Sequence, residues 1–163
     1  MSKFLDLCKS LSKSRAELDK YRRHCWKVGH QFIEGYKSYL DAPDGAIRVI
    51  PMSSSINLEN TYSIMDAISL DENGFWQFGI LISLEAGGVP PDRLKIRVRM
   101  RNTPNGLLIN VLEDHEGVIV DSTNEGDFLA VYELMQNTIN LYYQEGLDRF
   151  LAQPKSIRSI GFR

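Results

Sequence analysis

The sequence lacks the signatures of most secreted and membrane proteins. It has 163 residues but only two cysteines, Cys8 and Cys25, and no Cys-x-x-Cys pair. Both cysteines fall within one predicted helix, a geometry that does not suit an intrachain disulfide, so we expect both thiols to be reduced. No apolar run is long enough to cross a bilayer, and charges at Lys3, Asp6 and Lys9 interrupt any signal-peptide core. We therefore expect a cytoplasmic chain with no membrane contact.

Contiguous catalytic motifs are also absent. There is no Gly-x-Ser-x-Gly elbow, and the pair Gly87-Gly88 opens no predicted helix and lacks the Lys-Ser/Thr of a phosphate-binding loop. These absences argue against an enzyme but do not exclude one, because many active sites leave no contiguous signature. We expect neither a bound cofactor nor a metal.

Three groups of residues that can carry chemistry have simpler explanations. His24 and His30 are six apart and face different sides of a helix, while His30 and Glu34 share a face but have no third metal ligand nearby. The acidic run 113–116, which includes a histidine, can hold a cation or act as acid and base, but a polar turn between two strands explains it better. We interpret Cys25 as a small buried hydrophobe rather than a nucleophile.

Composition and charge are those of a folded protein with a segregated charge distribution. Apolar residues make up 43% and charged residues 25%, which predicts a single α+β domain over residues 1–153 and a short basic tail, 154–163. Residues 1–30 hold eight bases and three acids, residues 31–93 nine acids and three bases, and residues 103–153 nine acids and one base. Such segregation favours ion pairs within or between subunits over general nucleic-acid binding.

Residues 3–40 are predicted to form one long helix, with Pro43 beyond its end. At 1.5 Å per residue its length is about 55 Å, more than the width expected for the rest of the domain. We therefore expect residues near 22–40 to lie on the domain and the earlier turns to pair with another subunit. The alternative is that the whole seam packs on the chain's own sheet. The seam positions alternate in steps of three and four, as in a coiled coil: Phe4, Leu7, Leu11, Ser14, Leu18, Tyr21, Cys25, Val28, Phe32, Gly35 and Tyr39.

The remainder of the chain predicts an antiparallel meander of five to six strands, closed by a C-terminal helix. Short turns join the predicted strands and leave no room for crossover helices. The predicted strands cover residues 46–52, 62–70, 75–84, 94–101, 107–112 and 117–121, and the helix covers residues 127–152.

The stretch from Leu94 to Arg101 alternates apolar and basic residues without interruption. This is the period of a strand with one buried and one solvated face. The row of bases can bind nucleic acid or an anionic nucleotide, or it can form a solvated face neutralised by acids. We favour the second interpretation, because few aromatic residues accompany the row. The bases are Lys95, Arg97, Arg99 and Arg101.

We expect a non-catalytic interaction protein, an adaptor, chaperone-like or regulatory factor, that forms a homodimer through its N-terminal helix and binds another protein. The self-association residues are Phe4, Leu7, Leu11, Leu18 and Tyr21. The alternative is a nucleic-acid or nucleotide binder that uses the basic strand, and an enzyme without a recognisable motif is third.

Overall fold

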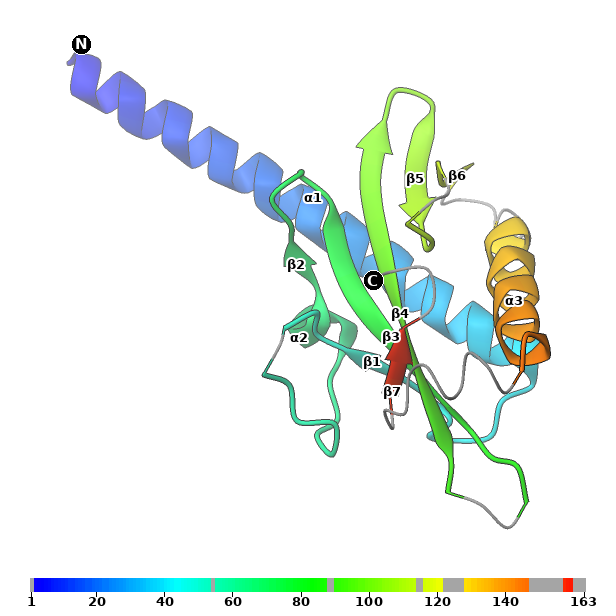
Figure 1. Ribbon diagram of the computed structural model, residues 1–163. Helices are drawn as coiled ribbons and strands as arrows, with labels where there is room; N and C mark the ends of the chain where they lie inside the picture. The colour runs from blue at the N-terminus through cyan, green and yellow to red at the C-terminus, as the bar shows by residue number, and fades with distance from the viewer. Residues whose placement is uncertain are drawn as a thin grey trace.

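The computed structural model describes residues 2–53, 55–87, 90–113, 116–121 and 128–146, together with the backbone of 157–159. It confirms the α+β class: a long N-terminal helix, an antiparallel sheet and a C-terminal helix (Figure 1). No helix among the described residues has both the length and the hydropathy that a membrane span requires. The elements are α1 (Lys3–Leu40), β1 (Ile47–Ile50), α2 (Ile64–Ala67), β2 (Ser69–Leu70), β3 (Trp76–Leu84), β4 (Asp92–Thr103), β5 (Gly106–Asn110), β6 (Val118–Val120), α3 (Leu129–Gln144) and β7 (Ile157–Ser159).

The sheet has the order β1-β3-β4-β5-β6, and its strands from β3 to β6 form the predicted antiparallel meander. Strand β4 is central: it pairs with all of β3 on one side and with β5 over its last residues on the other. β2 pairs only with the start of β3, and β7 runs parallel to the start of β4.

One face of the sheet forms the core against α1 and α3. The apolar positions of the alternating strand β4 are all buried on this face, as are Trp76, Phe78, Ile80 and Ile82 of β3. From α1, Cys25, Val28 and Phe32 pack into the same core. The Tyr132 hydroxyl on α3 donates a hydrogen bond of 2.8 Å to the backbone carbonyl of Phe32, which joins the two helices.

The predicted strand 62–70 is wrong over most of its length. Its first part forms the short helix α2, because the Ser63 hydroxyl accepts a hydrogen bond from the backbone N–H of Asp66 and caps the helix. Only Ser69 and Leu70 pair with β3, across the predicted turn. The spacing Ser63-x-x-Asp66 is a capping-box signal that the apolar content of the segment obscured.

The C-terminal helix is present but shorter than residues 127–152. α3 ends at Gln144, and Gly146 follows with φ of 69°, a left-handed conformation that terminates helices. The residues predicted to continue the helix, 147–152, lie outside the described part of the chain, as does Asp127, the first residue of the predicted helix. Within the basic tail, Ile157–Ser159 form β7 beside Arg93–Lys95.

Candidate functional site

The first half of α1 stands away from the rest of the protein. Figure 1 shows it extending well beyond the sheet, and every residue from Ser2 to Lys20 is exposed. Along this segment Phe4 and Leu7 are 70% and 69% exposed, and Leu11 and Leu18 are each 51% exposed. These four side chains are the predicted seam, and they lie on one stripe of the helix. They form an apolar stripe about 22 Å long, at 1.5 Å per residue over some 15 residues.

Tyr21 marks the base of this projecting segment. Its hydroxyl accepts a hydrogen bond of 2.7 Å from the backbone N–H of Asn102, at the end of β4. Its ring meets the Trp76 ring edge to face, with centroids 6.2 Å apart. Partial burial raises the pKa of the Tyr21 phenol. Tyr21 therefore belongs to the domain surface as well as to the seam.

The seam continues from Tyr21 directly into the core. Cys25, Val28 and Phe32 occupy the next positions of the same stripe and are at most 1% exposed. Burial raises the pKa of the Cys25 thiol to about 11, which keeps it protonated and unreactive, as the interpretation of a small hydrophobe requires. One stripe of α1 is thus buried in the core from Cys25 to Phe32 and exposed before Tyr21.

A hollow of about 400 Å³ lies at the junction of the two parts of α1. Leu18 and Arg22 of α1 form one side of it, and Ile68 and Trp76 form the other. Its lining combines these apolar side chains with charged and polar ones, and it adjoins the exposed seam at Leu18.

Arg99 of the basic row is neutralised by an acid of the same chain. Its Nη2 lies 2.9 Å and its Nε 3.0 Å from the Asp71 Oδ2, and both side chains are largely buried. Although burial raises the Asp71 pKa, hydrogen bonds from the backbone N–H groups of Phe75 and Asn73 and the Arg99 guanidinium outweigh it and lower the pKa. The Arg99 and Arg101 guanidinium carbons lie 4.0 and 4.6 Å from the centre of the Phe75 ring.

Part of the sheet face that carries the basic row is covered by other residues. Arg97 lies opposite Gly79 in the register, and Ile50 of β1 covers Gly79 so closely that a Cβ there would be 2.7 Å from Ile50 Cγ1. Lys95 lies opposite Leu81, which is fully buried on this same face. The sequence did not predict these contacts, because they come from β1, which pairs with β3 and not with β2, the next strand along the chain. The structure therefore places all four bases on one face, with part of that face covered.

Where the structure describes them, the remaining sequence candidates do not gather into a metal site. No group of three or more His, Cys, Asp or Glu side chains able to hold a metal occurs among the described residues. His30 and Glu34 lie on a shallow hollow next to Phe128 and Tyr132. His115 and Asp114 fall outside the described residues, so the acidic run 113–116 is not described as a whole.

Comparison with known proteins supplies no relative: no family model, no curated protein and no solved structure matches the chain.

Proposed function

We propose that this chain is a non-catalytic interaction protein that forms a homodimer through residues 4–21 of α1 and binds another protein. The observation that carries the proposal is the exposed stripe of Phe4, Leu7, Leu11 and Leu18 on a helix segment that stands away from the sheet. Helices of this length gain most of their stability from packing an apolar face, and this segment has no such packing as a monomer.

A second copy of the same segment fits the stripe in antiparallel orientation. When the order of residues is reversed, Leu7 faces Leu18 of the second subunit, Leu11 faces Ser14, and Phe4 faces Tyr21. The seam alternates between a and d positions of the heptad. Each of these three pairs brings an a position of one helix against a d position of the other, as antiparallel coiled coils require. At the flanking positions Ser10 faces Glu17, so this pairing does not bring like charges together there.

The position of the sheet favours the antiparallel over the parallel orientation. From Cys25 to Phe32 the core covers the same stripe of α1 that is exposed before Tyr21. A parallel second helix would have to continue into the space that the sheet occupies, since packed helices lie only about 8–10 Å apart. An antiparallel second helix instead ends at Tyr21, which places its Phe4 beside the hollow formed by Leu18, Ile68 and Trp76.

The second part of the proposal concerns the protein partner. Acids outnumber bases nine to three in residues 31–93 and nine to one in residues 103–153. A partner with a basic contact surface suits this distribution, because complementary charge speeds association and selects the partner.

The proposal is tested by sedimentation equilibrium of the full chain over a range of concentrations. We expect twice the chain mass for the wild type and the single-chain mass for Leu11→Glu, because the glutamates would be buried in the centre of the seam. Leu5→Glu is the matched control, since Leu5 is 52% exposed but lies outside the seam. A monomeric wild type at about 100 μM would refute the proposal, because helix pairing with a function in solution requires a micromolar dissociation constant.

A further inference from the structure

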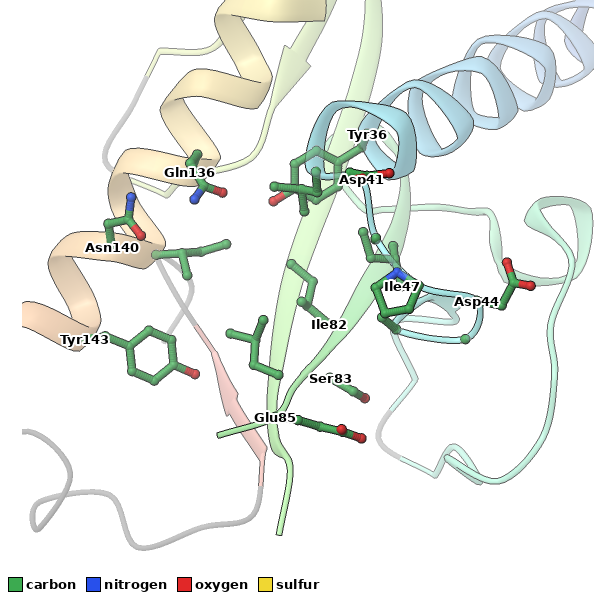
Figure 2. Close-up of a pocket in the computed structure, with 17 residues that line it drawn as sticks. Tyr36, Asp41, Asp44, Ile47, Ile82, Ser83, Glu85, Gln136, Asn140 and Tyr143 are labelled. Atoms are coloured by element: carbon green, nitrogen blue, oxygen red, sulfur yellow. The ribbon is translucent and has the colours of Figure 1, made fainter. Parts of the chain in front are cut away.

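A cavity of about 700 Å³ lies at the opposite end of the protein from the projecting helix. The C-terminal turns of α1, the segment before β1, the end of β3 and one side of α3 surround it (Figure 2). Its volume is typical of cavities that hold small organic ligands. The apolar part of its wall comes from Leu40, Ile47, Ile82 and Ile139. None of the seam residues or the bases of β4 contributes to it, so a ligand could bind here whether or not the protein forms the proposed dimer.

The Tyr36 hydroxyl is the unusual group in this wall. Tyr36 is 0% exposed, and no described residue accepts a hydrogen bond from its hydroxyl. In Figure 2 this hydroxyl and the Gln136 side chain both point into the space between α1 and α3. Two nearby tyrosines differ: Tyr132 donates to the Phe32 carbonyl and Tyr143 donates to Asp92 Oδ2 at 2.6 Å. Buried hydroxyls normally have partners, so the Tyr36 hydroxyl points to an acceptor that comes from outside the chain.

The charge around the cavity selects the ligand further. Its described lining includes Asp41, Asp44 and Glu85 but no lysine or arginine. Figure 2 shows Asp44 at the outer edge of the lining on the side away from α3, and Glu85 at the edge formed by the end of β3. A cationic group near this edge would be attracted, and an anionic group would be repelled.

We propose that the cavity binds a small amphipathic amine. Its apolar body packs between Ile82 and Ile139, its hydroxyl or carbonyl oxygen accepts a hydrogen bond from Tyr36, and its ammonium group lies near the acidic edge. The cavity is therefore a ligand site separate from the proposed dimer interface.

The test uses three probes of similar size that differ in one group each. Tyramine carries both the hydroxyl and the ammonium group, phenethylamine lacks the hydroxyl, and 3-(4-hydroxyphenyl)propionate replaces the ammonium group with a carboxylate. Binding to the full chain is followed by the ¹H–¹⁵N NMR shifts of Gln136 and Asn140. We expect tyramine to bind about fivefold more tightly than phenethylamine, the effect of one hydrogen bond, and the propionate to bind most weakly.

The role of Tyr36 is tested with Tyr36→Phe and the matched variant Tyr39→Phe. Tyr39 lies on the same helix and its ring stacks on Tyr36 at 6.3 Å between centroids, but it does not line the cavity. We expect Tyr36→Phe to abolish the difference between tyramine and phenethylamine, and Tyr39→Phe to preserve it. The thermal unfolding temperature of Tyr36→Phe should not fall, because its hydroxyl has no protein partner to lose.

A third variant keeps the test decisive if Tyr36→Phe does not fold. Asn140 is an exposed residue of α3 at the cavity, and Asn140→Trp should obstruct it and weaken tyramine binding at least tenfold. The proposal is overturned if tyramine at about 10 mM shifts neither Gln136 nor Asn140, since even millimolar affinity would saturate the site. It is also overturned if the three probes bind equally, or if neither Tyr36→Phe nor Asn140→Trp changes binding.

Discussion

Truncation of Leu7 provides a quantitative test of the proposed dimer. Leu7 is 69% exposed in the single chain, so the proposed second subunit would bury most of its side chain. Leu7→Ala removes three carbon groups, each worth about 0.8 kcal/mol when fully buried. Scaled by the exposed fraction, the loss is about 1.5 kcal/mol per chain, or about 3 kcal/mol for the two equivalent positions of the dimer. The dimer dissociation constant should therefore rise about a hundredfold.

The measurement is sedimentation equilibrium, with Leu5→Ala as the matched control. Leu5 is 52% exposed, two residues away and outside the seam, and alanine preserves helix propensity at both positions. We expect Leu5→Ala to leave the dissociation constant within about twofold of the wild type, because surface changes usually stay within about 0.5 kcal/mol. Equal effects of Leu7→Ala and Leu5→Ala, or no effect of either, would show that the stripe is not the interface.

Three further predictions concern the basic strand and the cysteines. Asp71→Asn should lower the free energy of unfolding by about 2 kcal/mol at pH 7, because the Arg99 guanidinium loses its carboxylate partner. Asp44→Asn is the control: Asp44 is exposed, so this change should alter the free energy of unfolding by less than about 0.5 kcal/mol. The folded-state pKa of Asp71 lies below its unfolded value, so the stabilisation is complete above about pH 5 and declines as the pH falls below about 4. Urea unfolding of wild type and Asp71→Asn at several pH values measures this decline, and a difference between the two proteins that does not shrink below about pH 4 would contradict the ion pair. The intact protein should not be retained on immobilised single-stranded oligonucleotides at about 0.15 M salt, and retention that Arg97→Glu abolishes would instead support the nucleic-acid alternative. In thiol labelling near neutral pH, the exposed Cys8 should react rapidly and Cys25 only after unfolding, since Cys25 is 0% exposed with a pKa of about 11. Equal labelling rates of the two thiols in the folded protein would contradict the burial of Cys25.

The parts of the fold that the sequence predicts well are those with a strict period. In β4 every second residue from Leu94 to Met100 is buried, as the alternation requires. The segment 62–70 failed because it is apolar without a clear period, and one capping interaction at Ser63 was enough to turn its first part into a helix. The burial of Leu81 on the basic face also escaped prediction, because it depends on contacts across β1 and β4 that are distant in sequence.

The candidate sites show a different limit of prediction from sequence. The heptad pattern of α1 is the same before and after Tyr21, yet the positions before Tyr21 are exposed and those from Cys25 to Phe32 belong to the core. The heptad period indicates that one stripe of the helix is apolar, but it does not indicate which part of the protein covers that stripe. The sequence favoured a basic row neutralised by acids, and for Arg99 the structure identifies the acid as Asp71, 28 residues away. Nothing in the sequence singled out Tyr36, because an orphaned hydroxyl is a property of packing.

Disulfide cross-linking between seam positions tests the antiparallel dimer most directly. In a chain with Cys8→Ser, a single Leu7→Cys places the two new thiols about 16 Å apart along an antiparallel pair but side by side in a parallel one. A disulfide needs Cα atoms within about 7 Å. We predict that Leu7→Cys alone does not cross-link, and that a mixture of Leu7→Cys and Leu18→Cys chains does so efficiently under mild oxidation. Rapid cross-linking of Leu7→Cys to itself would contradict the orientation, and no cross-linking in the mixture would contradict the interface.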